Sequence, residues 1–166
     1  DLVAVQFDGF ALLDTHEDFE VDLGAVEAAA RESGAKLVFL CSPGNPAGGA
    51  LAPRDVLALA CALDGRALVV VDEAYVEFAG SRTLASAVDG RSNLVVLRTL
   101  SKAHALAGAR IGCAIAAEDI IDALRRCQAP YPLPAPSVEL AMRALEPRSL
   151  ERTRRTVAST CAQRER

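Results

Sequence analysis

Short apolar runs alternate with amphipathic segments along the chain, a pattern typical of alternating strands and helices. The runs expected to form strands cover residues 36–41, 67–72, 93–99 and 110–116. The first two, with sequences KLVFLC and ALVVVD, have the compact form of strands that are buried on both faces. A further short apolar run, residues 2–6, is followed by an irregular segment that continues to Asp22.

Helix signals fall between and after these runs. The expected helices cover residues 22–33, 53–65, 119–127 and the chain from residue 137 onward. Asp22 can cap the first helix at its amino end, and Gly34 can stop it. Pro53 fits the first turn of the second helix. The proline cluster at residues 130–136 is expected to be extended.

Strands separated by helices predict a mostly parallel sheet with helices on both faces, a three-layer α/β/α arrangement. The chain has 166 residues, of which 51% are hydrophobic, enough for a real core in one domain or in part of a larger one. Because it starts at Asp1 and has Met142 as its only methionine, we expect a piece of a longer protein.

Composition argues against several classes of protein. The formal net charge of −4 disfavours a nucleic-acid binder, and no apolar run approaches the roughly 18 residues of a membrane span. The five cysteines form no CxxC pair and are expected to be buried thiols in a reducing cytoplasm. With only His16 and His104 as histidines, neither near a cysteine, we expect no metal site.

Lys102 is the first candidate for chemistry. The chain has only two lysines, Lys36 and Lys102, and arginine supplies the rest of its positive side chains. Arginine keeps its proton, whereas lysine can lose it and form a Schiff base with an aldehyde. Lys36, at the start of a strand, is expected to be a solvated charge, so Lys102 is the candidate nucleophile.

Polar side chains follow three successive predicted strands. Asn45 follows the first, Asp72 ends the second, and Ser101 and Lys102 follow the third. Ligands of open α/β sheets lie beyond the carboxyl ends of the strands. An amine, a carboxylate and an amide brought together there match the needs of pyridoxal phosphate, with the carboxylate beside the pyridine nitrogen. Each residue also has an ordinary interpretation: Asn45 in a turn, Asp72 ending a strand, Ser101 capping a helix.

Five short motifs resemble the fold-type I aminotransferases. They are SPGNPAG at 42–48, DEAY at 72–75, RTLSKA at 98–103, LAGARIG at 106–112 and APYPL at 129–133. The third, fourth and fifth are most similar to the histidinol-phosphate aminotransferase family. The resemblance runs from about Phe19 to the end of the chain and implies an incomplete large domain of that fold, with pyridoxal 5'-phosphate as cofactor.

The resemblance also implies the roles of individual residues at the cofactor ring. Lys102 would be the Schiff-base lysine and the proton shuttle, and Asp72 would pair with the pyridine nitrogen. Asn45 and Tyr75 would hydrogen-bond the ring's 3-oxygen. Lys102, Asp72 and Tyr75 are therefore the expected catalytic residues.

The phosphate of the cofactor would be bound by a second group of residues. The resemblance assigns Ser101 and Arg110 to it, and Thr99 is a further candidate for the same region. Arg110 could otherwise be an ordinary surface arginine.

Two positions depart from the family's pattern. The family usually has Asn-Asn-Pro-Thr-Gly where this chain has GNPAG at 44–48, and an aromatic residue where His104 stands. Asn45 is retained, so we expect altered loop stiffness without lost chemistry, and His104 is expected to be structural. The family's upstream glycine-rich turn and stacking aromatic ring, and its downstream arginine for the substrate carboxylate, have no counterpart in these 166 residues.

The function implied is transamination between histidinol phosphate and 2-oxoglutarate, with glutamate as the amino donor in the reverse sense. Residues 1–146 would belong to the cofactor-binding domain, and 147–166 would start the helix that leads to a small domain. A cytoplasmic homodimer is expected. The alternatives are an aromatic amino-acid aminotransferase, a phosphothreonine decarboxylase and a non-catalytic fragment.

Overall fold

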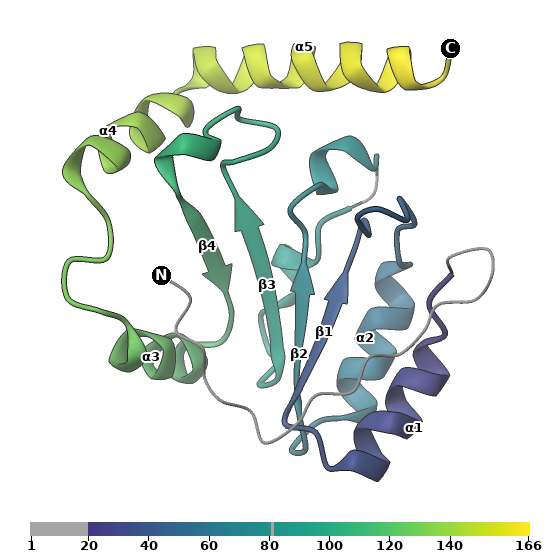
Figure 1. The fold of residues 1–166 in the computed structure, drawn as a ribbon. Coiled ribbons are helices and arrows are strands. Elements are labelled where there is room, and N and C mark those ends of the chain that lie inside the picture. Colours follow the sequence, from purple (N-terminus) through teal and green to yellow (C-terminus); the bar gives the residue numbers. More distant parts are fainter. Residues whose placement is uncertain (1–19, 81) are drawn as a thin grey trace.

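Four strands form a single sheet in the order β1-β2-β3-β4 in the computed structural model, which describes residues 20–80 and 82–166 (Figure 1). They are β1 (Leu37–Cys41), β2 (Leu68–Asp72), β3 (Leu94–Thr99) and β4 (Gly112–Ile115). All four predicted strands are confirmed, each shorter by one residue or a few. The apolar run at residues 2–6 lies outside the described residues.

The sheet is mostly parallel, as the sequence predicts. β1, β2 and β3 run parallel to one another, whereas β4 pairs with β3 in the antiparallel sense. Parallel neighbours need a long crossover, usually through a helix. The chain between β3 and β4 contains only turns and the short 3-10 segment η3 (Ala107–Ala109), so β4 returns beside β3 in the opposite direction.

Five α-helices accompany the sheet in the part of the chain that the structure describes. They are α1 (Leu23–Ser33), α2 (Pro53–Ala62), α3 (Glu118–Cys127), α4 (Ala135–Ala144) and α5 (Pro147–Arg164). Asp22 caps α1 as predicted, accepting hydrogen bonds from the amides of Gly24 at 2.8 Å and Ala25 at 3.1 Å. Gly34 follows α1 in the left-handed conformation, with φ of 66°. α4 begins earlier than predicted, because Pro136 lies within its first turn instead of extending the proline cluster.

The core lies between one face of the sheet and the layer formed by α1 and α2 (Figure 1). Alternate residues of β2 and β3 enter it, and Val69, Val71, Leu94 and Val96 are fully buried. Because successive strand residues point to opposite faces, their neighbours face away from these helices. On that opposite face Phe39 of β1 is 63% exposed.

The expectation of buried cysteines is wrong. Cys41, Cys61, Cys113 and Cys127 are exposed, and Cys161 is partly buried. Cys41 alternates with the buried Val38 and Leu40 of β1, so its side chain points away from the helical layer. The cysteines therefore contribute little to the core.

Helix α5 packs against the short segment η1 (Val76–Phe78) that follows β2. Arg164 donates a hydrogen bond to the carbonyl oxygen of Phe78 at 3.3 Å, and the Cys161 thiol lies 3.6 Å from the same oxygen. Over the described ranges, 20–80 and 82–166, none of the helices combines the length and the apolar character required to cross a membrane.

A substitution of Gly112 should destabilise the pairing of β3 and β4. A Cβ atom at this position would lie 2.9 Å from the backbone oxygen of Arg98, so one strand must shift. We expect Gly112→Ala to lower the free energy of unfolding by at least about 1 kcal/mol, as overpacking does. Urea unfolding of the full-length protein measures this, with Gly108→Ala as control because a Cβ there meets nothing within 4 Å. Equal stability of the two variants would contradict the close approach of β4 to the backbone of Arg98 at Gly112.

Candidate functional site

The carboxyl ends of the three parallel strands meet at one edge of the sheet. Cys41, Asp72 and Leu97 lie in register across β1, β2 and β3. The ladder continues one step further, because the amide of Ser42 donates to the Asp72 carbonyl and the amide of Glu73 to the Leu97 carbonyl, both at 3.0 Å. The loops that carry the predicted site residues therefore leave the sheet side by side.

Tyr75 is where these three loops meet. The amide nitrogen Nδ2 of Asn45, from the loop after β1, donates to the Tyr75 hydroxyl at 3.2 Å. The ammonium nitrogen of Lys102, from the loop after β3, lies 5.1 Å from the centre of the Tyr75 ring, within the range of a cation–π contact. An amide, a phenol and an amine from three separate loops are thus brought together.

The loop that presents Asn45 is held by its own backbone. The amide of Gly44 donates to the Gly49 carbonyl and that of Gly48 to the Gly44 carbonyl, both at 2.8 Å. The buried Ser42 hydroxyl accepts the amide of Leu51 at 2.9 Å, which closes the loop at its base. Asn45 itself is exposed at the tip.

Asp72 is half-buried at the end of β2. Its Oδ1 accepts the amide of Ala74 at 2.9 Å, which fixes the carboxylate at the start of the turn to Tyr75. Although the Cys41 side chain is exposed on one side, its contact with the end of the sheet removes part of its hydration, which raises the pKa of the thiol. The negative charge of the neighbouring Asp72 raises that pKa further. Cys41 therefore presents a neutral thiol beside the Asp72 carboxylate. The sequence alone does not indicate this neighbour, because the two residues meet only through the register of β1 and β2.

Thr99 and Ser101 form a second polar group at the end of β3. The Thr99 hydroxyl accepts the amide of Ser101 at 3.1 Å and lies 2.9 Å from the Ser101 hydroxyl. It also lies 3.2 Å from the carbonyl oxygen of Ile111, the residue after Arg110. The chain after Ser101 forms turns, so Ser101 does not cap a helix.

The loop from Lys102 to Arg110 contains two non-glycine residues in the left-handed conformation. Ala105 and Arg110 both have φ of 56°. Such residues are uncommon and cluster at functional sites, where the surrounding structure holds them. Here the amide of Ala105 donates to the Lys102 carbonyl at 2.9 Å and that of Leu106 to the Leu100 carbonyl at 3.0 Å. These bonds fix the backbone around the exposed lysine.

Arg110 and His104 complete this loop. The exposed Arg110 side chain donates to the carbonyl oxygen of Ala107 at 2.9 Å, which holds its guanidinium near the loop. The Nδ1 atom of His104 is buried without a hydrogen-bond partner among residues 20–80 and 82–166.

The side chains at this edge fit pyridoxal phosphate by the chemistry of their donors. Lys102 supplies an exposed amine for the aldehyde, Asp72 a carboxylate for the pyridine nitrogen, and Asn45 with Tyr75 a pair of groups for the 3-oxygen. Hydroxyls and a guanidinium, the groups that bind phosphate, follow β3 in the same region.

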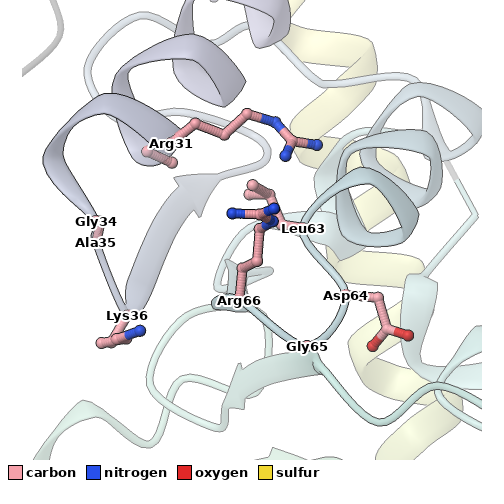
Figure 2. Close-up of a pocket in the computed structure, with 9 residues that line it drawn as sticks. Arg31, Gly34, Ala35, Lys36, Leu63, Asp64, Gly65 and Arg66 are labelled. Atoms are coloured by element: carbon pink, nitrogen blue, oxygen red, sulfur yellow. The ribbon is translucent and has the colours of Figure 1, made fainter.

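A different hollow lies at the opposite end of the sheet. It has a volume of about 470 Å³ between the ends of α1 and α2 and is lined by Arg31, Lys36 and Arg66 among others (Figure 2). None of the predicted site residues lines it. Arg31 is already engaged with Glu27 at 2.8 Å and with the Ala62 carbonyl at 2.5 Å.

Comparison with known proteins agrees with the geometry of the carboxyl edge. The family described as aminotransferase class I and II matches residues 3–165. A histidinol-phosphate aminotransferase of Stenotrophomonas maltophilia is 56% identical over 155 residues, which are 93% of this chain and 43% of that protein. The chain thus spans less than half the length of this curated relative.

Solved structures show the same fold. The histidinol-phosphate aminotransferase of Sinorhizobium meliloti, in complex with pyridoxal-5'-phosphate, is 30% identical with a TM-score of 0.80, over 90% of this chain and 41% of that one. The L-threonine-O-3-phosphate decarboxylase of Porphyromonas gingivalis is 29% identical with a TM-score of 0.62, over 66% of this chain and 34% of that one. The fold, the convergent loops and the family match lead to one conclusion: this chain belongs to the class I and II aminotransferases.

Proposed function

We propose that the protein containing this chain uses pyridoxal phosphate to transfer an amino group between histidinol phosphate and 2-oxoglutarate. The observation that carries the proposal is the meeting of Asn45, Tyr75 and Lys102 at the carboxyl edge of the sheet. The name printed for the Stenotrophomonas maltophilia relative supports the choice of substrate.

Three residues would orient the cofactor ring. Asn45 and Tyr75, already hydrogen-bonded to each other, would hold the 3-oxygen. Asp72 would hold a proton at the pyridine nitrogen, since a carboxylate stabilises the adjacent cationic N–H. Its bond from the Ala74 amide keeps one oxygen fixed, so the second oxygen is the one available to the ring.

The phosphate would be bound by Ser101, Arg110 and Thr99. Thr99 accepts the Ser101 amide and its hydroxyl lies against that of Ser101, which sets the direction of both hydroxyls. The guanidinium of Arg110 would add a charge-assisted bond.

Lys102 would carry the reaction. Pyridoxal phosphate, when bound, supplies an electron sink for charge that develops at the substrate's α-carbon. The Lys102 amine would bind the cofactor at rest, leave it when substrate binds, and then move the proton of the α-carbon as a general base and acid. Tyr75, whose ring faces the ammonium group, would orient it for this step.

We further propose that residues 1–146 are part of the cofactor-binding domain and that 147–166 connect it to a smaller domain. The intact protein would act on small molecules as a cytoplasmic homodimer. Exposed apolar side chains of α4 and the residue after it, Val138, Leu140, Met142 and Leu145, support an interface on this side of the molecule.

The direct test is an assay of the full-length protein. We expect glutamate to form from histidinol phosphate and 2-oxoglutarate, with far slower turnover of phenylalanine. Preferential use of phenylalanine would instead indicate an aromatic amino-acid aminotransferase. Release of carbon dioxide from phosphothreonine would favour the decarboxylase activity named for the Porphyromonas gingivalis structure.

A further inference from the structure

A buried ion pair lies behind the candidate site, on the helical side of the sheet. Glu73 directly follows Asp72, and Arg98 directly precedes Thr99. Glu73 is only 3% exposed, and it contacts the backbone of Leu84, a member of the hydrophobic core. Because neighbouring strand residues point to opposite faces, Glu73 and Arg98 project away from the face that carries Asp72 and Thr99.

The carboxylate of Glu73 is fully engaged. Its Oε1 accepts the amide of Leu84 at 2.7 Å, and its Oε2 accepts the hydroxyl of Thr83 at 2.5 Å. Arg98 Nη1 lies 3.6 Å from the same Oε2 and donates to the Thr83 hydroxyl at 3.3 Å. A buried charge persists only when it is paired and hydrogen-bonded in this way.

Arg98 also reaches a second acid. Its Nη2 forms an ion pair with Glu77 in η1, the segment that continues from Tyr75. The side chain of Arg98 is 25% exposed and that of Glu77 20% exposed, so the pair is only partly screened by water. One guanidinium therefore joins the end of β3 to the segment after β2 at two places, on either side of Tyr75.

We propose that the Glu73–Arg98 ion pair is a positioning element that fixes the loop carrying Asp72 and Tyr75 relative to the loop carrying Thr99, Ser101 and Lys102. This inference rests on the proposed function, because the two loops must reach opposite ends of one cofactor. The sheet alone sets their separation only up to the last ladder bond, from the Glu73 amide to the Leu97 carbonyl. Beyond that bond, side chains of the described residues connect the two segments through the contact of Lys102 with the Tyr75 ring and through Arg98. Of these links, the Glu73–Arg98 ion pair is the one whose carboxylate is buried.

Removing the Glu73–Arg98 ion pair should change cofactor binding, and not only the stability of the fold. When the pair is removed, Asp72 and Lys102 no longer keep a fixed separation, so both the affinity for pyridoxal phosphate and the protonation of its bound form change. Outer-shell partners of metal ligands typically contribute 10–100-fold in metal affinity or activity, and we take the same order for a residue that positions the groups binding an organic cofactor. We therefore expect the dissociation constant for the cofactor to rise about 10-fold or more in Glu73→Gln and in Arg98→Met.

The experiment uses the full-length protein and pyridoxal phosphate itself. The dissociation constant is measured by absorbance, and the pH midpoint of the absorbance of the bound cofactor is followed in parallel. We expect Glu73→Gln and Arg98→Met to shift this midpoint by ~0.5 unit or more. The double variant should lose no more affinity than either single one, since the two residues act as one unit.

Asn93→Ala is the matched structural control. Asn93 is buried at the other end of β3 and donates to the carbonyl oxygens of Ala60 at 2.7 Å and Ala67 at 3.2 Å. Its loss should lower the urea midpoint of unfolding while leaving the cofactor affinity and the pH midpoint unchanged. If Glu73→Gln behaves as this control does, the pair only stabilises the fold and the proposal is wrong.

Arg98→Lys keeps the charge and guards against a variant that does not fold. Arg98→Lys should raise the dissociation constant for pyridoxal phosphate less than Arg98→Met does. If Glu73→Gln does not fold, the comparison of these two variants tests the proposal in its place. Equal affinity of Arg98→Lys, Arg98→Met and the unsubstituted protein for pyridoxal phosphate would overturn the proposal. A full-length protein that binds no pyridoxal phosphate at all would overturn the proposed function, and the role of the ion pair with it.

Discussion

Replacing Lys102 with arginine in the full-length protein should abolish most of the proposed transamination. Arginine keeps the positive charge beside the Tyr75 ring but neither releases its proton nor attacks the aldehyde of the cofactor. General acid–base catalysis alone contributes about 10²- to 10⁴-fold, so we expect kcat to fall by at least that range. Steady-state kinetics with histidinol phosphate and 2-oxoglutarate measures the loss.

Lys36→Arg is the matched control for this prediction. Lys36 is the only other lysine of the chain and lines the hollow at the opposite end of the sheet (Figure 2). The same substitution there should leave kcat within about twofold of the unsubstituted protein, as surface changes usually do. A normal kcat in Lys102→Arg would show that Lys102 does not take part in the reaction.

Replacing Asp72 with asparagine should weaken catalysis by a smaller but still large factor. Asparagine has an oxygen to accept the Ala74 amide, so the turn to Tyr75 is expected to survive. It has no charge to hold a proton at the pyridine nitrogen, and a hydrogen bond to a charged group contributes about 1.5–3 kcal/mol. We therefore expect kcat/KM to fall about 10- to 150-fold.

The pH dependence of Cys41 gives an independent check of the same variant. The Asp72 charge contributes to the raised pKa of the Cys41 thiol, so its removal lowers that pKa and increases the thiolate fraction at a given pH. Alkylation of Cys41 should become faster in Asp72→Asn. Asp64→Asn serves as control, because Asp64 accepts a hydrogen bond from Ser92 far from this edge. An unchanged rate of Cys41 alkylation in Asp72→Asn would contradict the effect of the Asp72 charge on this thiol.

Much of the fold follows from local signals in the sequence. The strands β1 to β3 are apolar runs whose buried residues form the centre of the core, so burial and β propensity agree. Asp22 and Gly34 bound α1 because capping depends on a few neighbouring atoms. The proline cluster predicts an extended segment at Pro136, but proline also fits the first turn of a helix, where α4 places it.

Features that depend on distant parts of the chain did not follow from the sequence. The direction of β4 depends on how the chain turns after Lys102, where Ala105 and Arg110 adopt left-handed conformations that their residue types do not favour. The exposure of Cys41 depends on which face of β1 meets the helices. Tertiary packing decides both, so local preferences do not reveal them.

The candidate site shows the same division. The resemblance to fold-type I aminotransferases names Lys102, Asp72 and Tyr75, and the register of the parallel strands explains why their loops share one edge. Nothing in the motif DEAY by itself indicates that Glu73 is buried against an arginine of β3. That pairing appears only when the strands lie side by side, because Glu73 and Arg98 are 25 positions apart (98 − 73 = 25).

The most direct measurement is the identity of the residue that binds the cofactor. Full-length protein is mixed with pyridoxal phosphate, reduced with borohydride, digested and mapped by mass spectrometry. The account predicts a single modified peptide that carries the cofactor on Lys102. Modification of Lys36, of a lysine elsewhere in the protein, or of none would contradict it.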